Sequence, residues 1–186
     1  GGPVGNSGTR NAQVAGALGT GPVTIHSNGN ASLINVNAGI TIGSLAAQFN
    51  YGTSTITTAL AANALTVNQT TATSYAGAIT GSNATSNLIV QGNSSGILTL
   101  LGLDTFGGGT TAYTQPGLTV TGGATVRAGL DTSLGAIPAA ATASNIVLNN
   151  GILSLGGNLT NFATATTNPP LIIATNRGIG PSRLVS

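Results

Sequence analysis

The chain has 186 residues, of which four are Lys or Arg and two are Asp or Glu, so its formal net charge is only +2. Without Cys it has no disulfide framework, no thiol nucleophile and no thiolate metal site. Its basic residues are dispersed, whereas nucleic-acid binding needs them clustered on one face, so the composition excludes a nucleic-acid partner. These residues are Arg10, Arg127, Arg177 and Arg183.

Short apolar runs with a period of two predict β-strands along most of the chain. These runs lie at 23–27, 31–45, 54–58, 64–70, 87–92, 96–102, 117–129, 145–155 and 170–175. Clusters of Gly, Asn, Ser and Thr separate them, and these are the residues that turns require. Only 11–19 and 136–143 favour helix, and their Gly and Pro residues limit them to about one turn or a loop.

The small aromatic content distinguishes between the folds that many short strands can form. The chain has three Phe, three Tyr and no Trp, whereas sandwich and barrel cores of this size normally contain large aromatic side chains. A narrow solenoid instead stacks Val, Ile, Leu and Ala in ladders. We therefore expect an all-β fold with few or no helices, a right-handed parallel β-helix. Coils of roughly 20 to 25 residues would give about seven to nine coils.

Two segments of the chain resemble each other, at 16–33 and 132–155. Each contains a Leu-Gly pair and a Pro, followed by a strand, an Asn-Gly-type turn and another strand. The pairs are Leu18-Gly19 and Leu134-Gly135. Because repeat proteins are stabilised by contacts between neighbouring copies, so few copies indicate a segment of a longer array.

Several motifs occur in an order typical of one repeat family. They are Tyr75-Ala76-Gly77-Ala78-Ile79, Gly96-Ile97-Leu98-Thr99-Leu100, the Gly-rich turn from Gly107 to Thr111, and Ser133-Leu134-Gly135. In this order they resemble the autotransporter-associated β-strand repeat of long bacterial surface and secreted proteins, which include autotransporter passengers with β-helical stalks. The segment "YTQPG" at 113–117 departs from the family's pattern as an insertion after the turn.

The resemblance implies that residues 1–186 form a single β-solenoid segment. Within it, 1–38 is the tail of one repeat, 39–138 a full repeat and 139–186 the start of the next. It also implies a structural scaffold, stalk or fibre-forming protein that is extracellular or at the bacterial cell surface. We expect no enzymatic activity and no cofactor.

A carbohydrate-binding or polysaccharide-degrading β-helix is the alternative, and its site would need paired carboxylates. Asp104 and Asp131 are the only acidic residues and are roughly one coil apart, with Arg127 nearby. The other interpretation places Asp104 in a turn before "TFGGG" and has Asp131 bond to backbone amides in "GLDTS", with Arg127 as a solvated neighbour. We favour the turns and predict no catalytic, cofactor-binding or metal-binding residue.

The remaining polar motifs indicate no chemistry. His26 has no second His or nearby carboxylate with which to bind a metal or form a triad. The Gly-rich 106–111 lacks the Gly-Lys-Ser/Thr ending of a phosphate-binding loop. Asn-x-Ser/Thr triplets begin at Asn30, Asn68, Asn83, Asn93 and Asn158, as expected by chance in an Asn- and Thr-rich chain.

The expected partner is a second copy of the chain. Solenoid ends expose unpaired strands, and neither end of this sequence carries the Lys or Glu that usually protects them or an obvious polar cap. Low charge would also permit close packing. We therefore expect copies to stack end to end, with a surface glycan as another possible ligand. No apolar run is long enough for a membrane helix.

Overall fold

The computed structural model describes residues 8–28, 31–51, 55–81, 83–107, 116–136, 146–155, 173–175 and 183–185. Within these ranges it contains seventeen strands and one 3-10 turn, η1 (Asp131–Leu134), and no α-helix. All the strand pairs described are parallel. The chain is therefore all-β, as the sequence predicts.

The strands belong to three sheets. The four-stranded sheet has the order β1 (Gly8–Ala12), β3 (Ser32–Val36), β6 (Ile56–Leu60) and β9 (Ala78–Thr80). The six-stranded sheet runs from β4 (Ile40–Ile42) through β7 (Leu65–Gln69), β10 (Leu88–Gly92), β12 (Leu118–Thr121) and β14 (Ile146–Asn149) to β16 (Ile173–Thr175). The seven-stranded sheet runs from β2 (Val23–Asn28) through β5 (Leu45–Tyr51), β8 (Ala72–Tyr75), β11 (Ile97–Leu100), β13 (Thr125–Ala128) and β15 (Ile152–Leu155) to β17 (Arg183–Val185).

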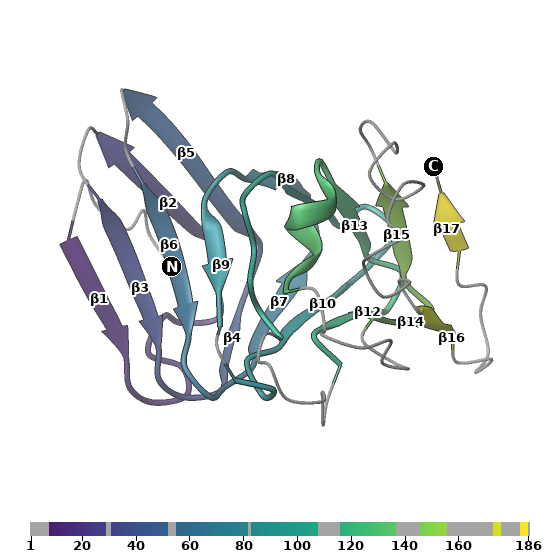
Figure 1. Cartoon of the computed structure of the whole chain (residues 1–186), viewed down its shortest axis with the longest axis horizontal. Coiled ribbons are helices and arrows are strands. Elements are labelled where there is room, and N and C mark those ends of the chain that lie inside the picture. Colours follow the sequence, from purple (N-terminus) through teal and green to yellow (C-terminus); the bar gives the residue numbers. More distant parts are fainter. Residues whose placement is uncertain are drawn as a thin grey trace.

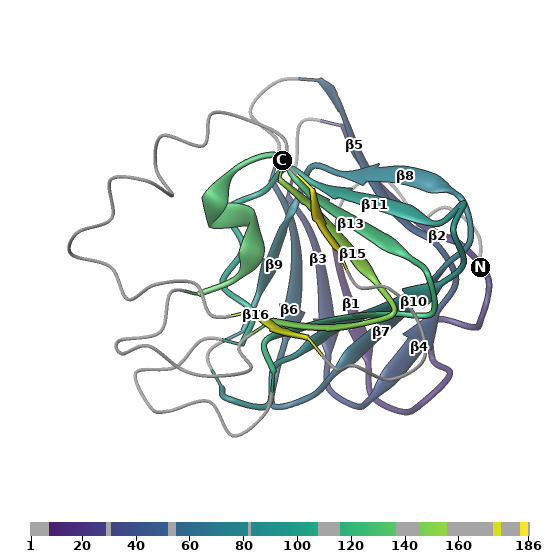
Figure 2. The same cartoon turned by 90° about the vertical axis from the view of Figure 1, so that its right-hand side faces the viewer.

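Successive coils of the chain add strands to the sheets in turn, which makes the molecule a β-solenoid. Figure 1 shows the coils following one another along the long axis, from β1 and β3 near one end to β15 and β17 at the other. Figure 2 looks along this stack and shows the sheets surrounding a common interior. The expected solenoid is confirmed.

Some coils are longer than the roughly 20 to 25 residues expected. Asn11 and Asn35 lie on adjacent coils 24 residues apart, whereas Leu45 and Thr73 on adjacent coils are 28 residues apart. The four-stranded sheet ends at β9. Beyond it the third side of the solenoid is made by segments such as 101–107 and η1, which use more residues than a strand does.

The apolar runs that predicted strands correspond to strands wherever the structure describes them. The period-two pattern missed the short strands β1, β8, β9 and β17, and all of β5 beyond Leu45. The segment 11–19, which favoured helix, ends β1 and continues in two tight turns, closed by bonds from Ala17 N to Val14 O and from Gly19 N to Gly16 O. Most of 136–143 is outside the described residues.

Aliphatic side chains of the six-stranded sheet form continuous ladders in the core. One ladder joins the first buried position of each strand, and its described members are 0–1% exposed. The ladder is Ile40, Leu65, Leu88, Leu118 and Ile146. A parallel ladder in register brings equivalent positions of successive coils together, so an aliphatic residue repeated once per coil buries itself against its own kind.

The two Leu-Gly pairs adopt related turns. Gly19 and Gly135 have positive φ angles of 70° and 92°, Leu18 packs against the core, and Leu134 is buried. The strands after them nevertheless belong to different sheets, since β2 lies in the seven-stranded sheet and β14 in the six-stranded sheet. The local turn is therefore shared between the two segments, but its place in the coil is not.

Gln69 is a buried amide that joins three coils. Its Oε1 accepts a hydrogen bond from Leu45 N at 3.3 Å, and its Nε2 donates to Thr73 Oγ1 at 2.8 Å and to Ile97 O at 3.2 Å. Nε2 also lies 2.6 Å from Thr71 O, an acceptor at the same corner. The side chain is completely buried, and all its polar atoms find partners.

The contacts of Gln69 predict a large loss of stability in Gln69→Leu. This change leaves Leu45 N and the facing carbonyls without their partner, so we expect it to lower the free energy of unfolding by about 2–4 kcal/mol. Gln91, half-buried on the next coil opposite Asn68, is the matched control. Gln91→Leu should change stability by less than about 1 kcal/mol in the same urea titration. Equal losses of stability in the two variants would contradict the role of Gln69 in joining the coils.

Candidate functional site around Asp104

Asp104 lies where the four-stranded sheet ends. The segment 101–107 runs beside β9, with a bond from Thr105 N to Ile79 O at 2.9 Å. Asp104 Oδ1 accepts the hydrogen bond of Ile79 N at 2.7 Å, so it takes the place that a backbone carbonyl fills in a parallel ladder. Asp104 N donates to Thr132 O of η1 at 2.9 Å. The residue thus joins β9 to the following coil.

The side chain of Asp104 is deeply buried. Its exposed fraction is 3%, and Oδ2 has no hydrogen-bond partner. Burial disfavours the charged carboxylate and raises the pKa of Asp104 to about 7, although the hydrogen bond from Ile79 N opposes this shift. Below this pKa the carboxyl is mostly neutral, which removes the cost of an unpaired buried charge.

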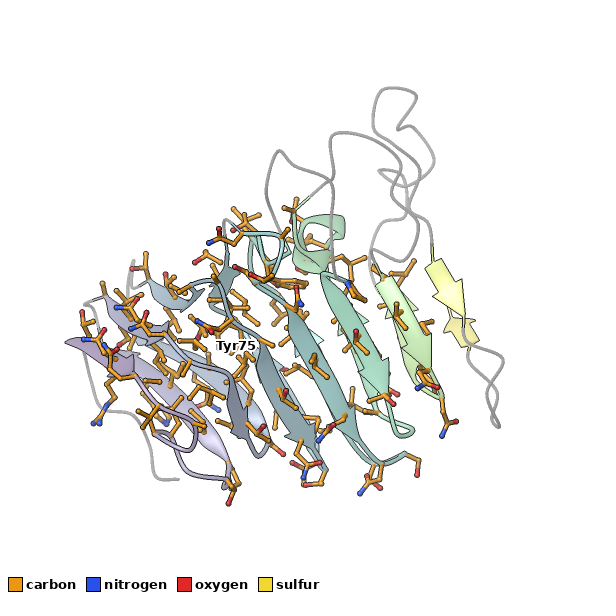
Figure 3. All side chains as sticks on the ribbon, turned by 90° about the horizontal axis from the view of Figure 1, so that it is seen from below. Tyr75 is labelled. Carbon is orange, nitrogen blue, oxygen red and sulfur yellow. The ribbon has the colours of Figure 1, made fainter. Side chains whose placement is uncertain are left out.

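Tyr75 is the second buried ionisable group of this region. Figure 3 shows it among the side chains of the interior. Its Oη lies 2.7 Å from Thr58 Oγ1 on β6, and its exposed fraction is 0%. Burial raises the pKa of Tyr75, the hydrogen bond with Thr58 lowers it, and the charge of Asp104 raises it. The phenol therefore stays neutral and serves as a hydrogen-bonding core residue.

The segment after Asp104 closes the same corner of the solenoid. Gly107 N donates to Ser86 O at 2.6 Å, and Ser133 Oγ donates to Gly102 O at 2.8 Å. Gly135 lies so close to Phe106 that a Cβ there would be 2.6 Å from the Phe106 carbonyl oxygen. The polar atoms of this corner satisfy backbone groups that would otherwise be unpaired at the end of the four-stranded sheet.

The structure separates two of the three residues of the carbohydrate-site hypothesis. Asp104 and Asp131 do belong to adjacent coils, since Asp104 N bonds to the residue after Asp131. However, Asp104 is buried, whereas Arg127 is exposed on the outer face of β13, in register with Thr99 and Ser154. The side chain of Asp131 is outside the described residues. The Asp104 carboxyl accepts a hydrogen bond from Ile79 N, 25 residues away in the sequence, so it bonds between coils and not within a local turn as the turn interpretation would have it.

The other polar motifs occupy structural positions. His26 lies on β2 between the buried residues Ile25 and Ser27 and is itself half-buried. Its side chain is therefore on the outer face of the strand, opposite to theirs. Of the Gly-rich 106–111, only Phe106 and Gly107 are described, and both are buried. Among the Asn-x-Ser/Thr triplets, Asn68, Asn83 and Asn93 are exposed, whereas Asn30 and Asn158 are outside the described residues.

Gln69 and Tyr75 make polar contacts in the core, and the sequence analysis did not assign this role to either residue. Gln69 follows Leu65 and Val67 at an interval of two, so its inward orientation could be inferred from the alternation. The position of Tyr75 gave no comparable signal, because Ala, Thr and Ser surround it. Its partner Thr58 belongs to another sheet, and only the folded chain brings the two hydroxyls together.

Comparison of the chain with protein-family models, curated proteins and solved structures finds no match. Over the described ranges, no group of three or more His, Cys, Asp or Glu side chains is placed to hold a metal ion. A search of the same residues finds no helix of sufficient length and hydropathy to span a membrane.

The pKa of Asp104 predicts that the protein loses stability as the pH rises. Below about pH 4 the carboxyl is protonated in both the folded and the unfolded chain. Between pH 4 and 7 the unfolded chain, with its ordinary pKa of 3.8, releases a proton that the folded chain retains, and above pH 7 the loss is complete. The expected decrease is at most about 4 kcal/mol.

Urea denaturation at pH 4, 6 and 8 measures this dependence in the wild type and in Asp104→Asn. The variant keeps an oxygen for Ile79 N but does not titrate, so its stability should change little over this range. Asp131→Asn and His26→Gln are the controls, because the chain has only two acidic residues and one His. The assignment to Asp104 would be contradicted if the decrease in stability persisted in Asp104→Asn and disappeared in one of the controls. The residue substituted in that control would then be its cause.

Proposed function

We propose that the chain is a structural segment of a larger extracellular scaffold at the bacterial cell surface, where it contributes length and stiffness to a stalk. The observation that supports this most directly is the continuity of the core. The aliphatic ladder from Ile40 to Ile146 fills the interior of successive coils. An array built of such coils gains length by adding contacts of the same kind.

The use of polar groups in the core agrees with this role. Asp104, Gln69 and Ser133 bond to backbone atoms of neighbouring coils, at 2.7 Å from Ile79 N for Asp104 and 2.8 Å from Gly102 O for Ser133. These contacts hold coils together. The resemblance to the autotransporter-associated repeat supports the proposal separately, because the fold it implies is a β-solenoid.

Contact between copies is part of the proposed role. The outer strands of a solenoid have backbone groups that another strand can pair with. The net charge of +2 over 186 residues gives little repulsion between copies. We therefore propose self-association through the ends of the solenoid, and the glycan-binding alternative loses the exposed carboxylate that Asp104 was to supply.

The location is tested by labelling intact cells of the source organism with an antibody raised against the purified chain. We expect label on intact, unpermeabilised cells, and removal of the epitope by external protease. In-frame deletion of residues 32–100 should bring an epitope at the distal end of the scaffold closer to the envelope in immunogold images. Label that appears only after permeabilisation would overturn the proposal.

A glycan array with the same purified chain tests the alternative. The scaffold role predicts no saturable binding to any glycan. Saturable binding that is lost on substitution of outward-facing residues of the six-stranded sheet, such as Asn68 or Gln91, would support the carbohydrate-binding class instead.

A further inference from the structure

Arg10 occupies a core position on the terminal strand β1. The strand pairs with β3 so that Arg10 is opposite Ile34, and Ile34 continues the column through Thr58 and Ile79. These three residues are buried, with exposed fractions of 0–2%. On the other three strands of this sheet the column therefore faces the interior, but in β1 it carries an exposed guanidinium.

The neighbouring residues show independently which face of β1 Arg10 belongs to. Asn35 Nδ2 donates to Asn11 Oδ1 at 2.8 Å, an exposed contact that places Asn11 on the outer face. Ala12 is completely buried on the inner face. Because side chains alternate along a strand, Arg10 leaves the backbone on the same side as Ala12. The side chain of Arg10 is nevertheless exposed, as expected when a long basic side chain on an inward face keeps its charged group in water.

The rest of the first coil is also covered. Ala12, Val23 and Ile25 are 0–2% exposed even though β1 and β2 are the outermost strands of their sheets. Leu18, from the turns between β1 and β2, packs against this core. The end of the solenoid formed by β1 and β2 thus has buried apolar side chains in most inward positions and a charged residue in one.

We propose that Arg10 closes this end of the solenoid against a second copy of the chain. A copy stacked on β1 would place a coil over the guanidinium and remove it from water, which is costly unless a carboxylate pairs with it. The two acidic residues of the chain are Asp104, which is buried, and Asp131, which lies in η1. Inward-pointing charges are a known protection of strand edges.

This inference rests on the proposed self-association and restricts it. Head-to-tail stacking needs two open ends, and unlimited filaments form only from such heterologous contacts. With the β1 end closed, copies can meet only through the opposite end, and two identical ends that meet form a closed pair.

The test replaces Arg10 with Ile, the residue that stands opposite it on β3, in the full chain. Sedimentation velocity over a range of concentrations, with electron microscopy of the same samples, should show species larger than a dimer that lengthen with concentration. The wild type should not exceed a dimer. Arg10→Lys should behave as the wild type, and Arg10→Gln, which folds with a polar side chain in place, should also form species larger than a dimer.

Arg127→Ile is the matched control. It removes the same charge and adds the same side chain, but on the exposed outer face of the central strand β13, so it should sediment as the wild type does. Wild-type filaments with β1 against another copy, or Arg10→Ile and Arg10→Gln that both sediment like the wild type, would overturn the closure. If Arg127→Ile formed species as long as those of Arg10→Ile, the closure would also be overturned, because the lower net charge would then be the cause of assembly. Surface labelling tests the scaffold role independently of these results.

Discussion

Parallel pairing of successive coils in register is the constraint on which the rest of this structure depends. It places each residue against the residue one coil before and one coil after it, so a position is defined by its column. Ile40, Leu65 and Leu88 share a column and exclude water together. A residue that departs from its column must find a partner in a neighbouring coil or reach water.

The buried polar residues follow this rule. Gln69 stands in a column of inward positions and is satisfied by atoms of the coils on both sides. Asp104 supplies an oxygen to Ile79 N where the four-stranded sheet ends, and the Tyr75 phenol meets the Thr58 hydroxyl. Each of these groups contributes to holding coils in register. Burial of the Asp104 carboxyl makes its charged form costly, which explains why it retains its proton to about pH 7.

The same rule connects the core to the proposed function. A coil that is apolar inside and nearly uncharged outside can be repeated to build length, and its open edges can accept another coil. An array of such units has a defined size only if its end strand cannot pair with a further coil. Arg10 can prevent a further coil from pairing with β1, because it carries a charge in a column that is buried in the next coils.

How much of this could be predicted depends on the range of the interactions. Strand positions and the solenoid class could be predicted from the sequence, because side-chain alternation and the small aliphatic composition are local properties. The Leu-Gly turns at 18–19 and 134–135 were recognised for the same reason. The length of the later coils could not be predicted, since the loops that replace strands beyond β9 leave no periodic signal.

The sequence by itself therefore determined an all-β chain of short strands with an aliphatic interior, and it limited the chemistry by supplying only two carboxylates, one His and no thiol. The tertiary structure alone decided that Asp104 is buried beside Ile79 N, that Tyr75 meets Thr58, and that Arg10 lies over the Ile34 column. The physical reason is register. A shift of one residue in strand pairing reverses which side chains face the core, and that choice is made by contacts between residues a coil apart.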